Sequence, residues 1–177
     1  MVELSSEKIK YYLNLEQSRY QTTKKGNALE DLIWYMLGKV PGVSPIDRNQ
    51  LDSVNSEAID LAFQNEKSLD GLSFIDEIII VECKNWSRPI SGMQLYWFLR
   101  KLRNRNLKYG VFVARNGIAG NNCNTVGARS VLAEALREGR HIIIITKKEL
   151  EKITNTDQIV KLFREKCHNL VISVKVN

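Results

Sequence analysis

Residues 74–84 read Phe-Ile-Asp-Glu-Ile-Ile-Ile-Val-Glu-Cys-Lys, and this stretch decides the fold. Its apolar centre, residues 78–81, predicts a strand buried on both faces, as strands of parallel sheets are. Because side chains alternate along a strand, Glu82 and Lys84 point to the same face as Ile80. Ionised groups avoid the end of an apolar strand unless they are paired or bind a ligand. The stretch therefore predicts a central strand that ends in a charged site.

The remaining periodic segments predict a mixed α/β domain. We expect helices over residues 6–20, 22–39, 91–106, 124–138, 147–153 and 156–167. We expect strands over residues 43–50, 57–64, 74–84, 109–115 and 141–146, and residues 171–176 are compatible with a final edge strand. Three successive strands favour an antiparallel meander, and the later strand–helix–strand units favour parallel crossovers. The expected organisation is an N-terminal helical extension (1–21), a core (22–147) and a C-terminal helical tail (148–177) of the same domain.

Charge is distributed unevenly along the 177 residues. Residues 1–86 hold nine Lys/Arg and 14 Asp/Glu, whereas residues 87–177 hold 17 Lys/Arg and six Asp/Glu, within a net charge of +6. Residues 83–133 include nine basic residues and no acidic one. This asymmetry predicts a nucleic-acid partner, although an ordinary solvated basic face would also account for it.

Composition excludes several classes of protein. No apolar run approaches the roughly 20 residues of a membrane span, and the first residues lack the apolar core of a signal peptide. The spacing of Cys83, Cys123 and Cys167 is typical of neither a zinc finger nor a disulfide framework. We therefore expect a cytoplasmic protein with reduced thiols and no membrane partner.

Two carboxylates elsewhere in the chain add to the charged site. Asp60 lies in the strand segment Ala-Ile-Asp-Leu-Ala-Phe (58–63), on the face of Ala58 and Ala62, whose small side chains leave space for an ion or a substrate. Glu30 lies at the border of the apolar stripe of the helix over residues 22–39. Each feature alone is also typical of an ordinary ion pair or exposed carboxylate, so the prediction rests on their combination.

The order Glu30, Asp60, Glu82-Cys83-Lys84 resembles the PD-(D/E)xK, or restriction-endonuclease-like, nuclease superfamily, and within it the Mrr-type restriction endonucleases. The matching stretches are residues 26–30 (Gly-Asn-Ala-Leu-Glu), 58–60 (Ala-Ile-Asp), 82–84 (Glu-Cys-Lys) and 109–115 (Tyr-Gly-Val-Phe-Val-Ala-Arg), within a resemblance over about residues 22–146. Ile59 replaces the proline that gives the superfamily its name. The resemblance implies a restriction-endonuclease-like core, a mixed central β-sheet flanked by helices in the order αβββαβ.

The resemblance also implies a Mg²⁺-dependent endodeoxyribonuclease, with Mn²⁺ as a substitute metal, acting in restriction, defence or repair. Asp60, Glu82 and the backbone carbonyl of Cys83 would be the metal ligands, a donor set suited to a hard cation that keeps several waters. Lys84 would orient the attacking water and stabilise charge in the transition state. Glu30 would hold a metal-bound water or help to bind a second metal.

The helix over residues 91–106 is the expected DNA surface. The side chains that form its buried stripe are Leu95, Phe98, Leu99 and Leu102. The predicted DNA contacts lie on its other faces and at nearby element ends, and they are Arg88, Gln94, Trp97, Arg100, Lys101, Arg103, Arg105, Lys108 and Arg115. For Trp97, stacking on a base and packing at a protein interface both stay open.

Other functions stay open on the sequence. A Holliday-junction resolvase shares the core and the small size, and a catalytically silent DNA-binding module or a subunit of a larger defence complex would keep the same fold. We expect double-stranded DNA as the partner. A homodimer or a partner recognition subunit stays open, because Mrr-type enzymes usually carry a separate DNA-reading domain and 177 residues hold little beyond the core. We expect no sequence-specific cleavage unless a partner supplies recognition.

Overall fold

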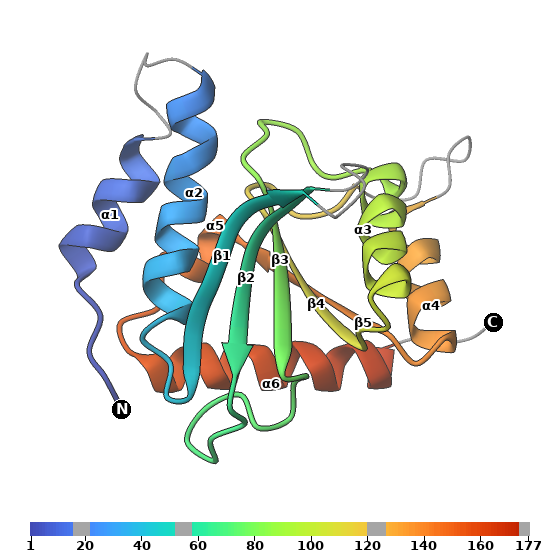
Figure 1. The fold of residues 1–177 in the computed structure, drawn as a ribbon. Coiled ribbons are helices and arrows are strands. Elements are labelled where there is room, and N and C mark those ends of the chain that lie inside the picture. Colours follow the sequence, from blue (N-terminus) through green and yellow to red (C-terminus); the bar gives the residue numbers. More distant parts are fainter. Residues whose placement is uncertain (16–21, 52–57, 120–126, 174–177) are drawn as a thin grey trace.

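The computed structural model describes residues 1–15, 22–51, 58–119 and 127–173, which build a five-stranded sheet with helices on both faces (Figure 1). In spatial order the strands are β1 (Val43–Leu51), β2 (Ala58–Asn65), β3 (Ile78–Lys84), β4 (Tyr109–Ala114) and β5 (His141–Thr146). β2 is antiparallel to β1 and β3, whereas β4 is parallel to β3 and β5. This mixed sheet confirms the predicted fold class and is compatible with a restriction-endonuclease-like core.

Each face of the sheet packs against its own helices (Figure 1). One face carries α1 (Ser6–Leu15), α2 (Thr22–Leu37), α5 (Lys147–Leu150) and α6 (Thr156–Ser173), and the other carries α3 (Gly92–Asn104) and α4 (Ala128–Arg137). Val81 belongs to the first apolar cluster and Ile80 to the second, and their exposed fractions are 0% and 1%. β3 is therefore buried on both faces, as its apolar run predicted.

α3 lies against the sheet through the stripe that its sequence predicted. Leu95, Phe98, Leu99 and Leu102 are all buried. A Cβ atom at Gly110 of β4 would lie 2.7 Å from Leu102 Cδ2 and 2.8 Å from the Phe98 ring, so the missing side chain lets the helix approach the strand closely. This contact fixes which faces of α3 point away from the sheet.

β3 begins at Ile78, four residues later than predicted. The buried side chain of Asn65 donates hydrogen bonds to the carbonyls of Leu72, Ile75 and Asp76, at 2.9, 3.3 and 3.0 Å, and so holds residues 72–76 in a turn. Asp76 Oδ2 in turn accepts the backbone N–H groups of residues 108 and 109, at 2.6 and 3.0 Å. These side-chain contacts over 7 to 33 residues are invisible to local periodicity.

The predicted edge strand over residues 171–176 is wrong for the part that the structure describes, because α6 continues to Ser173. Ile159, Phe163 and Cys167 are buried at helical spacing, and the helix continues past them. Val171 and Ile172 are 60% and 77% exposed, and their β-branched character is overridden by continuation of the helix. Residues 174–176 of that predicted strand lie outside the described residues, as do residues 16–20, 57 and 124–126 of other predicted elements.

No helix within the described ranges combines the length and the apolar character needed to cross a membrane.

Replacing Leu99 by alanine should lower the free energy of unfolding by about 2–5 kcal/mol, because this fully buried side chain anchors α3 on the sheet. Urea-induced unfolding measures the change. Leu69→Ala is the matched control, since Leu69 is 88% exposed and its truncation should change stability by less than about 0.5 kcal/mol. Equal effects of the two substitutions would contradict the packing of α3.

Candidate active site

The sheet opens between β2 and β3 where β3 acquires its charged residues. Paired positions between these strands run from Gln64–Ile78 to Leu61–Val81, whereas β2 pairs with β1 as far as Ala58. Beyond this point the N–H of Cys83 donates to Asp60 Oδ2 at 2.8 Å. The Asp60 side chain thus takes the role that a backbone carbonyl has in the ladder, and its carboxylate lies between the two strands.

Four charged groups converge at this opening. Lys84 Nζ lies 2.6 Å from Glu82 Oε1 and 3.6 Å from Asp60 Oδ2. Lys101 reaches in from α3, with Nζ 2.6 Å from Glu82 Oε2. The side chains of Asp60, Glu82 and Lys101 are 15%, 10% and 14% exposed, so the ion pairs are shielded from water. The structure therefore brings together the three residues that strand alternation and the superfamily resemblance singled out, and adds Lys101 to them.

An open hollow of about 330 Å³ lies beside these charges, within the range of small-molecule sites. Its lining residues are Ala58, Asp60, Glu82, Lys84, Trp97, Arg100 and Lys101. β2 and β3 supply the carboxylates, and α3 supplies an aromatic and two basic side chains. The hollow thus contains carboxylates that could bind a cation beside basic side chains that could bind an anion.

Glu30 borders this cluster but makes its own contacts with β1. Its carboxylate lies 3.8 Å from Arg48 Nη2 and 3.5 Å from Asn49 Nδ2. Burial, followed by the negative charge of Asp60, raises the pKa of Glu30 above the usual value for glutamate. Sequence analysis missed Arg48 and Asn49. Asn49 adopts a left-handed φ of 53°, which asparagine tolerates better than most residues, but no local sequence pattern marks Arg48 or Asn49 as a neighbour of Glu30.

The Asp60 carboxylate is held in an environment that disfavours its charge. Burial and the neighbouring Glu82 raise the pKa of Asp60, although Lys84 and the Cys83 N–H partly offset them. For Lys84, burial lowers the pKa, but Glu82 and Asp60 outweigh it, so the pKa is raised and the ammonium form is retained. Burial also raises the pKa of the Cys83 thiol, which packs in the cluster under α2, on the opposite face of the sheet. That thiol therefore stays protonated, and the negative charges of Asp60, Glu30 and Glu82 raise its pKa further.

The donor set fits a hard divalent cation. Asp60 and Glu82 offer carboxylate oxygens, and the raised pKa of Asp60 reflects burial first and repulsion by Glu82 second, both of which a bound cation would offset. Mg²⁺ needs only one or two protein carboxylates because it keeps several waters. In the part of the chain that the structure describes, no group of three or more His, Cys, Asp or Glu side chains is placed to hold a metal ion, as the four protein ligands of a structural zinc site would be. The Cys83 carbonyl as a ligand stays a prediction.

Five of the predicted DNA contacts lie at or near this end of the sheet. Trp97, Arg100 and Lys101 line the hollow itself. Arg115 follows β4, and its N–H donates to the carbonyl of Lys84 at 3.2 Å. Arg88 lies in the segment after β3, and its guanidinium is 5.1 Å from the centroid of the Trp86 ring.

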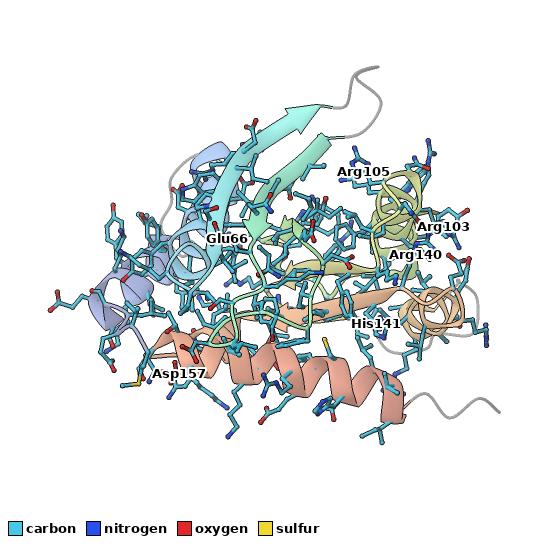
Figure 2. The ribbon with its side chains drawn as sticks, turned by 60° about the horizontal axis from the view of Figure 1, so that its bottom comes forward. Glu66, Arg103, Arg105, Arg140, His141 and Asp157 are labelled. Carbon is cyan, nitrogen blue, oxygen red and sulfur yellow. The ribbon has the colours of Figure 1, made fainter. Side chains whose placement is uncertain are left out.

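The other four predicted DNA contacts have roles within the fold or lie farther away. Arg103, which Figure 2 labels on α3, forms ion pairs with Glu134 of α4 and with Glu138 directly after α4, and so links two helices. Gln94 Oε1 accepts the N–H of Ser91 at 3.1 Å and caps α3. Arg105 Nη1 donates to the carbonyl of Lys101 at 3.3 Å. Lys108 precedes β4, at the end of the sheet opposite to the hollow.

No protein-family model and no curated protein matches this chain. Among solved structures, SfsA of Pyrococcus furiosus in complex with Ca²⁺ is similar, with a TM-score of 0.39 and 17% sequence identity. The match covers 71% of this chain and 58% of SfsA, so this chain spans less than two thirds of the length of that protein.

Replacing Asp60 by asparagine should raise the free energy of unfolding at about pH 7. Because the pKa of Asp60 is raised in the folded protein, its carboxyl binds protons more tightly there than in the unfolded chain. Stability is therefore lost as the pH rises through and above the ordinary aspartate pKa of about 4, and asparagine avoids this loss while keeping an acceptor for the Cys83 N–H.

Urea unfolding at about pH 5 and about pH 7 measures this effect, and the gain should be larger at the higher pH. Asp70→Asn is the matched control, since Asp70 is exposed in a turn. A loss of stability in Asp60→Asn at about pH 7, or a change equal to that of Asp70→Asn, would show that the ionised carboxylate is not strained.

Proposed function

We propose that this chain is a metal-dependent endodeoxyribonuclease that hydrolyses phosphodiester bonds of double-stranded DNA. The observation that carries the proposal is the convergence of Asp60, Glu82 and Lys84 at the opening between β2 and β3. The resemblance of their order to the PD-(D/E)xK superfamily supports the same reading. The basic residues of α3 beside them support DNA as the substrate.

Asp60 and Glu82 would hold Mg²⁺, or Mn²⁺ in its place. When bound, such an ion neutralises charge on the phosphate and lowers the pKa of a coordinated water. Asp60 suits this role because burial and the neighbouring Glu82 disfavour its charge in the absence of a cation. Glu30, with its contacts to Arg48 and Asn49, would act from the border of the site on a water molecule.

Lys84 is the residue best placed to act on the reacting groups. Its ammonium is held by Glu82 and Asp60 at the rim of the carboxylate cluster, and its raised pKa keeps it charged at neutral pH. It would donate hydrogen bonds to the attacking water and to the phosphate oxygen on which negative charge develops. Lys101 and Arg100 add two positive charges to the hollow, which favours entry of a phosphodiester.

Incubation of supercoiled plasmid with the protein and Mg²⁺ tests the proposal. We expect nicking or linearisation by the wild type, and a loss of about 10²–10³-fold or more in rate for Lys84→Ala, because a positioned charge at the phosphate is removed. Lys161→Ala is the matched control, since Lys161 is 76% exposed on α6, far from the site, and its variant should cleave like the wild type.

The same assay discriminates the alternatives. Cleavage of a four-way junction without cleavage of linear duplex would favour a Holliday-junction resolvase. Absence of cleavage of any DNA form with Mg²⁺ or Mn²⁺, together with salt-sensitive binding, would favour a silent DNA-binding module. Full activity of Lys84→Ala would remove this lysine from the mechanism.

A further inference from the structure

Trp97 is a large aromatic side chain that is exposed to solvent at the mouth of the candidate active site. It is 50% exposed and lines the same hollow as Asp60, Glu82 and Lys84. The core does not need it, because α3 is already anchored by its buried stripe on the opposite face. An exposed tryptophan beside charged groups can therefore bury its apolar ring against a ligand that has a flat apolar surface.

The indole is held by a chain of contacts across α3. Tyr96 meets it edge to face, with ring centroids 6.3 Å apart and an interplanar angle of 72°. Arg103 lies over the Tyr96 ring at 5.7 Å and is itself held by Glu134 of α4 and by Glu138 directly after it. Such support fixes the orientation of a ring before a ligand arrives and so reduces the entropy lost on binding.

The charges around Trp97 decide which kind of ligand fits. The Arg100 guanidinium lies 5.2 Å from the centroid of the indole, and the ammonium groups of Lys84 and Lys101 line the same hollow. Glu82 already pairs with both ammonium groups, and an apolar protein surface placed here would offer no hydrogen-bond acceptor to them or to the guanidinium. A nucleotide satisfies both demands, because its base stacks on the ring and its phosphate pairs with the cations.

The geometry of stacking indicates whether the bound nucleotide is paired or unpaired. In an intact duplex, each base is covered on both faces by its neighbours, and only its edges are accessible in the grooves. The face of a base becomes available to an aromatic ring only when the nucleotide is unpaired or unstacked. A ring at the mouth of the hollow therefore favours an unpaired nucleotide close to the phosphate that enters it.

We propose that Trp97 and Arg100 form a stacking subsite for an unpaired nucleotide. DNA that contains a bulge, a flap or another interruption of pairing is then the preferred substrate over uninterrupted duplex. The preference in cleavage rests on the proposed nuclease function, whereas the preference in binding does not.

Fluorescence anisotropy in EDTA tests the subsite without cleavage. The probes are two labelled DNA duplexes of the same sequence, one of which carries a short internal bulge with 2-aminopurine as the unpaired base. Wild-type protein should bind the bulged duplex about 5- to 150-fold more tightly, which corresponds to the stacking of about one base on an aromatic ring. Binding should also quench the 2-aminopurine fluorescence.

Variants of exposed aromatic residues separate stacking from other effects. Trp97→Ala should abolish both the preference and the quenching, whereas Trp97→Phe should keep most of each because it retains a ring. Tyr11→Ala is the control, since it removes an aromatic side chain that is 60% exposed on α1, and it should leave both measurements unchanged. Thermal unfolding verifies that each variant is folded.

The outcomes separate this inference from the proposed function. If plasmid is not cleaved but the Trp97-dependent preference is present, the nuclease proposal fails and the subsite stands. If plasmid is cleaved but Trp97→Ala binds both duplexes as the wild type does, the subsite is overturned and the nuclease stands. Equal weakening of both duplexes by Trp97→Ala, or a Trp97-dependent dimer with no preference for the bulge, also overturns it.

Discussion

The structure depends on how a strand that is buried on both faces can end in charged residues. β3 pairs with β2 on one side and β4 on the other, and helices cover both of its faces. Ionised Glu82 and Lys84 at its end would be strongly unfavourable unless they were compensated. The fold compensates them by opening the sheet at Asp60 and by bringing Lys101 from α3. The charged hollow is thus a direct consequence of the position of β3.

α3 supplies the side chains that complete the hollow beside the charged end of β3. Its buried stripe and the close approach at Gly110 fix its rotation, while the Arg103 ion pairs tie it to α4. With one face fixed on the sheet, Trp97 and Lys101 are directed to the hollow. Side chains on regular, well-packed elements are positioned more accurately than those on loops. The same packing that stabilises the protein therefore arranges the groups proposed to meet DNA.

Stability and the proposed activity make opposite demands at Asp60. Burial and the neighbouring Glu82 disfavour its ionised form, as its raised pKa shows. That cost would fall if a cation were bound, so the same imbalance would favour binding of the proposed metal. The ionised form of Glu30, on α2, is disfavoured in the same way, because burial and the negative charge of Asp60 raise its pKa. Such local conflict within an otherwise consistent fold is typical of functional sites.

The sequence by itself determined the order of the five strands and of the helices between them, the burial of β3 and the shared face of Glu82 and Lys84, because alternation and helical periodicity are local properties of the chain. It did not predict the turn held by Asn65, the length of α6, or Arg48 and Asn49 beside Glu30. It placed Lys101 on the basic side of a helix, and only the tertiary structure put its ammonium on Glu82. Contacts of this kind join residues far apart in the chain, and packing, not local pattern, decides which of them meet.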